Sequence, residues 1–206
     1  MKTLIVTASI MGEQGCSTHL AGRVKHHLIN HGVNPLFTER DLVKDNLPHL
    51  TAPEFSSWWQ EGADKELLPS QCDSDALLEE LQAHDLIVLA IPTYNFGMPS
   101  QFKAWFDRIL RPGISFRYTS GRPEGLLSNK PVLVLITRGG LLSDTAPDHQ
   151  TSYITTLLAF IGLTDIRFIY AGGLNMGDKV KTRALAEADS QIAGYVRRIA
   201  GRDSHD

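Results

Sequence analysis

Short apolar runs alternate along the chain with longer segments in which apolar residues recur at helical spacing. The apolar runs predict five strands, at residues 3–8, 33–41, 85–91, 131–137 and 166–171. The longer segments predict five helices, at residues 17–30, 73–84, 99–110, 152–161 and 179–199. Because strands and helices alternate, we expect one parallel sheet with right-handed crossovers and with helices on both faces. The pattern therefore predicts an α/β protein built as a three-layer α/β/α sandwich.

Local signals support several of these bounds. One face of the first helix is predicted from four apolar residues: Leu20, Val24, Leu28 and Ile29. Asp73 or Ser74 is expected to cap the second helix, and Pro99 is expected to begin the third. Residues 114–118 predict a short extended arm.

Residues 42–73 interrupt the alternation and are expected to be irregular. The segment contains three prolines and an apolar cluster formed by Phe55, Trp58 and Trp59. An excursion of this length inside a compact domain often serves function. The chain shows no internal repeat and no low-complexity linker, so we expect one domain over residues 1–206.

Composition narrows the classes of protein. The 206 residues are 42% hydrophobic and 21% charged, and the net charge of −3 argues against nucleic-acid binding. No apolar run approaches the roughly 18 residues of a membrane span, and the N-terminal run fits a strand better than a signal peptide. Cys16 and Cys72 lack metal or redox spacing. A cytoplasmic, reduced protein is expected.

Other polar signals are interpreted as structural. His27 and His31 stand one helical turn apart without an evident third ligand, so we expect a solvated helix face and no metal site. Three charged residues of the third helix are expected to pair on its surface: Lys103, Asp107 and Arg108. Trp105 and Phe106 are expected in the core or in a dimer contact.

Candidate chemistry lies in the loops after the first, third and fourth strands, since ligands of such sheets bind beyond the carboxyl ends of the strands. The first loop brings small and hydroxyl-bearing residues to a helix start, which suits a phosphate: Ser9, Gly15, Cys16 and Ser17. It lacks the Lys of a Walker loop and the spacing of a dinucleotide motif. A plain helix cap with a Gly turn remains the alternative.

The other two loops suit a flat ring. Tyr94, Asn95 and Phe96 offer aromatic walls and an amide, although aromatic residues are more often core. The fourth loop contains Thr137, Arg138, Gly139 and Gly140. Its paired glycines let backbone N–H groups approach a ring edge. A plain glycine loop is the alternative. Together the three loops describe a mononucleotide with a planar head, and flavin mononucleotide (FMN) fits that description.

At these loops the chain resembles the FMN-dependent NADH:quinone oxidoreductases and NADH-azoreductases of the flavodoxin-like superfamily. The resembling pieces span nearly the whole chain: "SIMGEQGCST", "PTYNFGMPSQFKAWFDRILRPGISFRYT", "PEGLLSNK", "TRGG" and "FIGLTDI". The long middle piece is highly specific. The resemblance implies a flavodoxin-like fold with strand order 2-1-3-4-5.

The resemblance also implies roles for residues. Ser9, Gly15, Cys16 and Ser17 would hold the FMN phosphate and ribityl chain; the ring would be lined by Thr93, Tyr94, Asn95 and Phe96, and its pyrimidine edge by Thr137, Arg138, Gly139 and Gly140. The family works as a homodimer with sites at the subunit interface. One FMN per subunit would pass a hydride from NADH or NADPH to quinones and azo compounds in ping-pong order. The flavin would carry the chemistry, with Asn95, Tyr118 and Phe160 orienting the acceptor.

Three other functions are compatible with parts of the same pattern. A flavodoxin-type electron carrier is usually strongly acidic, whereas the net charge of this chain is only −3. A receiver-type signalling domain would need an acidic cluster that the first loop lacks. An FMN-supplying flavin reductase or an FAD-using NAD(P)H quinone reductase remains open. So do the natural acceptor, a redox role of Cys16, and the choice between NADH and NADPH, for which the candidate cations are Arg122, Arg111 and Lys44.

Overall fold

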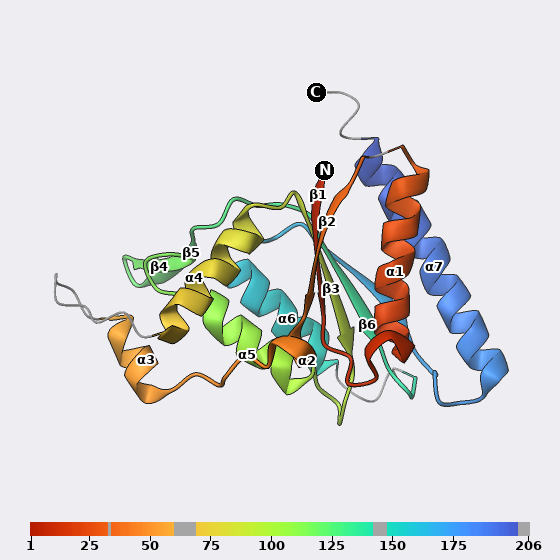
Figure 1. Ribbon diagram of the computed structural model, residues 1–206, viewed down its shortest axis with the longest axis horizontal. Helices are drawn as coiled ribbons and strands as arrows, with labels where there is room; N and C mark the ends of the chain where they lie inside the picture. The colour runs from red at the N-terminus through yellow and green to blue at the C-terminus, as the bar shows by residue number, and fades with distance from the viewer. Residues whose placement is uncertain (33, 60–68, 142–147, 202–206) are drawn as a thin grey trace.

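A five-stranded parallel sheet forms the centre of the molecule (Figure 1). The computed structural model describes residues 1–32, 34–59, 69–141 and 148–201. The sheet strands are β1 (Lys2–Thr7), β2 (Leu36–Asp41), β3 (Leu86–Pro92), β6 (Val132–Thr137) and β7 (Ile166–Ala171). Their order is β2-β1-β3-β6-β7, and every pairing is parallel. Counted along the chain, this is the predicted order 2-1-3-4-5.

Helices cover both faces of the sheet, so the predicted three-layer sandwich is confirmed (Figure 1). On one face lie α1 (Cys16–Asn30) and α7 (Asp178–Ala200). On the other lie α4 (Pro69–Gln82), α5 (Ser100–Ile109) and α6 (His149–Phe160). Each layer packs its own apolar cluster against the sheet.

The two inner strands β3 and β6 are buried at every position. Helices on both faces exclude water from them, which is why their sequences are continuously apolar. Their register pairs Pro92 with Thr137, and that of β1 with β3 pairs Thr7 with Ala90. The carboxyl ends of β1, β3 and β6 therefore stand side by side, and the three candidate loops leave the sheet at one edge.

The segment 42–73, which was expected to be irregular, is largely helical where it is described, so that prediction was wrong. It contains α2 (Leu42–Asp45) and α3 (Ala52–Ser57), and α4 already begins at Pro69. Asp73 and Ser74 lie inside α4 and do not cap it. Pro53 and Pro69 stand in the first turns of α3 and α4, where proline is well tolerated. Residues 60–68 lie outside the described residues.

Arg108 contradicts the expected surface pairing, because its side chain is 0% exposed. Its guanidinium donates hydrogen bonds to the Glu54 carboxylate at 3.1 Å and to the Pro48 carbonyl at 2.8 Å. These bonds fasten the chain before and within α3 to α5. Lys103 does pair with Asp107 on the α5 surface, as expected. Trp105 and Phe106, expected in the core or in a dimer contact, are fully buried in the core.

The predicted aromatic cluster is only partly buried. Trp58 is 8% exposed and lies under the guanidinium of Arg111, 5.0 Å from the centre of its ring. Phe55 and Trp59 are about half exposed. Asp75 pairs with Arg111 at 3.1 Å, so this cation is already engaged by protein groups.

Three further expectations differ in detail. Ile29 is 58% exposed and does not belong to the buried face of α1. His27, expected on a solvated face, contacts Asp189 of α7 at 2.8 Å, and Arg23 donates to the same carboxylate at 2.7 Å. The second strand begins at Leu36, and residue 33, where it was expected to start, lies outside the described residues.

A two-stranded hairpin stands apart from the main sheet: β4 (Phe116–Thr119) and β5 (Arg122–Gly125). The expected arm at 114–118 overlaps β4, whereas β5 was not predicted. At Gly125 an added Cβ would lie 2.2 Å from the backbone nitrogen of Gly162, directly after α6. The backbones thus meet without a side chain between them, which holds the hairpin against the C-terminal end of α6.

No helix in the described parts of the chain is long and apolar enough to cross a membrane. The same residues contain no cluster of three metal-ligating side chains.

Candidate functional site

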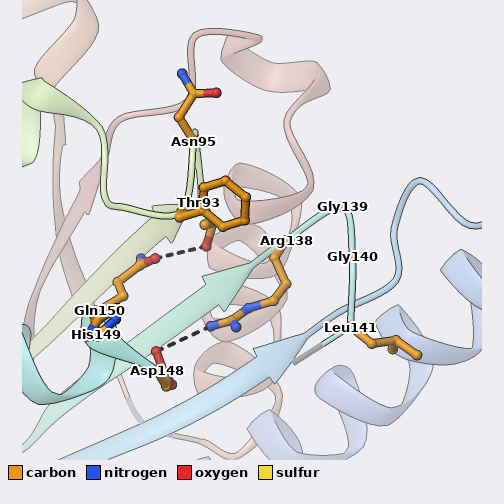
Figure 2. Close-up of a pocket in the computed structure, with 10 residues that line it drawn as sticks. Thr93, Asn95, Arg138, Gly139, Gly140, Leu141, Asp148, His149 and Gln150 are labelled. Carbon is orange, nitrogen blue, oxygen red and sulfur yellow. Dashed lines mark hydrogen bonds and ion pairs between the residues drawn. The ribbon is translucent and has the colours of Figure 1, made fainter. Parts of the chain in front are cut away.

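A cavity of about 550 Å³ lies where the loops after β3 and β6 meet the start of α6 (Figure 2). Six of the predicted site residues line it: Thr93, Asn95, Phe96, Arg138, Gly139 and Gly140. Four residues that the sequence did not single out complete the lining: Leu141, Asp148, His149 and Gln150. The predicted ring-binding loops therefore do converge on one concave site.

The loop after β3 forms a tight turn that presents two side chains outward. Tyr94 and Gly97 pair through backbone hydrogen bonds of 2.9 and 3.1 Å. Between them Asn95 and Phe96 have φ values of 47° and 69°, a region that Asn tolerates but that is costly for Phe. The Phe96 ring is 95% exposed, so the alternative of a core residue is wrong for it. A strained, exposed ring at a cavity mouth is suited to contacting a ligand.

Gln150 joins the turn to α6. Its Oε1 accepts a hydrogen bond from the Thr93 hydroxyl at 3.0 Å (Figure 2). The residue is only 5% exposed, and its Nε2 has no hydrogen-bond partner among the described residues. Because a buried unpaired donor costs about 1–3 kcal/mol, a ligand acceptor at this cavity would relieve the cost.

The side chain of Arg138 is paired with Asp148 (Figure 2) and also lies over an aromatic ring. Asp148 lies 3.6 Å from its guanidinium, and the Tyr170 ring lies 6.0 Å away. Burial works against ionisation of Asp148, but hydrogen bonds from Thr151 and the charge of Arg138 outweigh it and lower the pKa of the carboxyl. The carboxylate is therefore charged at neutral pH, caps α6 through the Thr151 N–H, and fixes Arg138.

The paired glycines are fixed through their carbonyls and keep their backbone N–H groups free of acceptors in the described chain. Gly139 O accepts from Asn175 N–H at 3.0 Å, and Gly140 O accepts from Gly173 N–H at 2.9 Å. The N–H groups of Gly139 and Gly140 have no acceptor in the described chain. A Cβ at Gly139 would lie 2.4 Å from the Asn175 side-chain amide, so any larger residue would have to displace that side chain. The loop can thus donate to an electron-rich ring edge.

The first loop does not line this cavity but lies beside it. Ile10 N–H donates to the Tyr94 hydroxyl at 3.2 Å, which ties the two loops together. An added Cβ at Gly15 would come within 2.1 Å of the Ser9 hydroxyl oxygen, so the two residues are in close contact. Gly15 is the N-cap of α1 and has no side chain that could satisfy the helix start.

The start of α1 offers several unused donors. Its first α-helical bond runs from His19 N–H to Gly15 O, which leaves the N–H groups of residues 16–18 without an intrahelical acceptor. The hydroxyls of Ser17 and Thr18 are buried and have no partner among the described residues. Such a group of donors fits a phosphate, and with the ring cavity beside it the site fits FMN.

Four residues that were expected at the flavin do not line this cavity: Thr137, Tyr94, Tyr118 and Phe160. Thr137 is buried, and its carbonyl accepts from Thr93 N–H at 2.7 Å. The Tyr94 hydroxyl accepts a hydrogen bond from Ile10 N–H and so contacts the first loop. Tyr118 and Phe160 pack together, 6.4 Å apart, at the far end of α6. Since α6 carries His149 at its start and Phe160 at its end, about 16 Å of helix separates them from the cavity.

A second cavity, of about 500 Å³, adjoins the first across Phe96. It shares Phe96, His149 and Gln150 with the first cavity and adds Gly97, Met98, Lys103 and Tyr153. Neither His149 nor Gln150 was predicted, because the helix was expected to begin at residue 152. Asp148 is a favoured N-cap residue type, so the capping rule could have placed the helix start three residues earlier.

Comparison with known proteins identifies the family of the chain. The family model described as having a flavodoxin-like fold matches residues 1–196. An FMN-dependent NADH:quinone oxidoreductase of Alcanivorax borkumensis is 42% identical over 93% of this chain and 98% of its own. Another, from Dechloromonas aromatica, is 41% identical over 93% and 98%.

Solved structures have the same fold. The azoreductase of Bacillus anthracis strain Sterne superposes with a TM-score of 0.85 at 23% identity, covering 96% of this chain and 99% of its own. An FMN-dependent NADH-azoreductase of B. anthracis strain Ames Ancestor, solved in complex with FMN, gives 0.83 at 22% identity over 97% and 99%. By its sequence relatives and its fold, the chain belongs to the flavodoxin-like family of FMN-dependent NADH:quinone oxidoreductases.

Proposed function

We propose that the protein is an FMN-dependent oxidoreductase that transfers a hydride from NADH or NADPH to quinones and to aromatic azo compounds. The observation that carries the proposal is the juxtaposition of an unsatisfied helix start at Ser17 with the cavity between Phe96 and Gly139. One end suits a phosphate and the other a flat ring, within the family to which the chain belongs. We also propose a cytoplasmic location for the enzyme.

The residues divide the work of holding FMN. Helix α1 would bind the phosphate through the N–H groups of residues 16–18 and the hydroxyls of Ser17 and Thr18. The N–H groups of Gly139 and Gly140 would donate to the pyrimidine edge, where they stabilise negative charge. When bound, FMN supplies the two-electron chemistry, so that the protein needs no nucleophile of its own.

The remaining cavity residues position groups and exclude water. Gln150, oriented by Thr93, would donate its free N–H to an acceptor in the cavity. Asp148 would hold the Arg138 guanidinium at the cavity wall. Phe96 and Asn95 would cover the ring from the turn, with Asn95 orienting the acceptor. Donor and acceptor would use the same open face in succession, which gives ping-pong order.

The placement of Tyr118 and Phe160 favours a homodimer. They lie about 16 Å of helix away from the cavity of their own chain, too far to contact a flavin bound there. We propose that they cover the flavin of a second copy, so that each subunit completes the site of its partner. One FMN per subunit follows from this arrangement.

The test of the function begins with the purified protein and the mass of any bound flavin. Under anaerobic conditions NADH should bleach the bound FMN, and a benzoquinone or an azo dye should restore its colour. A flavin that stays oxidised with both NADH and NADPH would indicate an electron carrier, and recovered FAD would indicate the other quinone reductase class.

A mixing experiment tests the shared site. A Tyr118→Ala/Phe160→Ala chain and a chain that cannot bind FMN should each turn over quinone poorly. After they are unfolded and refolded together, mixed dimers should regain activity if one intact site forms across the interface. No recovery above the sum of the separate chains would contradict the shared site.

A further inference from the structure

A third cavity lies next to the proposed flavin site, on the side of α7. Its volume is about 480 Å³, and six side chains form most of its lining: Leu141, Tyr170, Lys179, Val180, Arg183 and Glu187. Leu141 lines both this cavity and the one between Phe96 and Gly139. Figure 2 shows Leu141 at the end of the glycine loop, its side chain directed away from Thr93 and Gln150. The two cavities are therefore neighbours joined at this residue.

Tyr170, at the edge of the sheet, lines the third cavity, and its ring is held in place by three contacts. The Tyr170 hydroxyl is hydrogen-bonded to the Thr151 hydroxyl at 2.7 Å. The ring stacks on Phe168 at 6.1 Å between centres and 16° between planes, and Arg138 lies 6.0 Å from it. Tyr170 is still 37% exposed, so part of the ring remains available. With Leu141 and Val180 it offers apolar contact for a flat ring such as a purine.

The other wall is charged and carries a net positive charge. Lys179 and Arg183 are four residues apart and so lie on one face of α7. Arg183 pairs with Glu187 at 2.7 Å, which neutralises one positive and one negative charge. No carboxylate in the described chain lies within ion-pair distance of Lys179. One ammonium group is thus left for an anion beside the aromatic wall.

We propose that this cavity binds the adenosine diphosphate half of the nicotinamide donor, with Tyr170 and Val180 contacting the adenine and Lys179 the diphosphate. The inference rests on the proposed function, since it assumes that the nicotinamide half occupies the flavin cavity on the other side of Leu141. Arg111, one of the cations considered for the choice between NADH and NADPH, is only 4% exposed and already pairs with Asp75.

The test uses ADP-ribose, which carries this half of the donor and cannot reduce a flavin. Its dissociation constant is measured by calorimetry on the oxidised, FMN-loaded protein. Lys179→Glu should weaken binding about tenfold or more, because it replaces attraction to the diphosphate by repulsion. The matched control is Lys181→Glu, which makes the same charge change on an exposed residue of α7 that lines none of the three cavities. It should leave the dissociation constant within about twofold.

The outcomes separate this inference from the proposed function. If wild type oxidises NADH but the two variants bind ADP-ribose equally well, the cavity does not hold the adenine half, while the enzyme assignment stands. If both variants weaken binding equally, only the overall charge matters, and the inference is again wrong. If the FMN-loaded wild type oxidises neither NADH nor NADPH, the proposed function is wrong, and the proposed donor site is wrong with it.

Discussion

The Arg108 guanidinium and the Glu54 carboxylate form an ion pair 3.1 Å long, in which the side chains are 0% and 7% exposed. Replacing Arg108 by Ala should cost about 3–5 kcal/mol of unfolding free energy, because a buried carboxylate then loses its cation. The Pro48 carbonyl loses a donor in the same variant. Urea unfolding measures the change.

The same helix provides the control. Lys103→Ala removes an exposed pair with Asp107 and should cost no more than about 0.5 kcal/mol. If the two alanine variants lost similar amounts of stability, Arg108 would not be the residue that anchors α3.

Gly15→Ala should impair flavin binding. The new Cβ would lie 2.1 Å from the Ser9 hydroxyl oxygen, so the first loop must move away from the start of α1. We expect FMN affinity to fall at least about tenfold by fluorescence titration of the apoprotein, equivalent to about 1.4 kcal/mol. Gly22→Ala, within α1 and with no atom within 4 Å of the added Cβ, should bind FMN normally and gain up to about 1 kcal/mol of stability.

Phe96→Asn should separate stability from binding. Asn tolerates the left-handed backbone region better than Phe, so the apoprotein should gain about 1 kcal/mol in unfolding free energy. Loss of the exposed ring should weaken FMN binding in the same titration. A variant that bound FMN as tightly as wild type would show that Phe96 does not contact the flavin.

Acid should release the contact between α1 and α7 at Asp189. Hydrogen bonds from Arg23 lower the pKa of this carboxyl; burial opposes them, and His27 adds to the lowering. A lowered pKa stabilises the fold above the ordinary Asp value of about 3.9, and that stability is lost as pH falls through the folded-state pKa.

Asp189→Asn should therefore be less stable than wild type at pH 7, by about 1 kcal/mol for this partly exposed pair. The difference should shrink as the pH falls below about 4. Glu79→Gln, at an exposed position of α4, is the comparison. A stability gap that stayed constant from pH 7 to pH 3 would argue against the ionised carboxylate as its cause.

The sheet was predictable because its inner strands are covered on both faces. Apart from Thr137 at its end, β6 is as continuously apolar as β3, which is typical of parallel strands covered on both faces. The start of α6 was not predicted, because His149 and Gln150 are polar and interrupt the apolar pattern of the helix. The burial of Arg108 was also missed, because its partner Glu54 is 54 residues away in the sequence.

The site was predictable as far as local chemistry reveals it. Phe96 and Gly139 follow predicted strands, and they line the cavity because ligands bind beyond the carboxyl ends of parallel strands. Gln150 and Asp148 enter the same cavity from a helix, and only the packing of α6 brings them there. The separation of Tyr118 from its own cavity depends on the length of α6, a relation between elements that no single motif records.

The contact between Gly125 and Gly162 limits how this hairpin can vary. Any side chain at Gly125 would overlap the backbone after α6, and Gly162 combines a φ of +101° with a Cβ position 2.7 Å from a carbonyl oxygen. In a saturation library selected for folded protein, both positions should return glycine almost exclusively. The tip is restricted as well, because Ser120 and Gly121 have φ values of 49° and 80°. Variation for new acceptors should therefore be confined to the exposed strand positions of the hairpin.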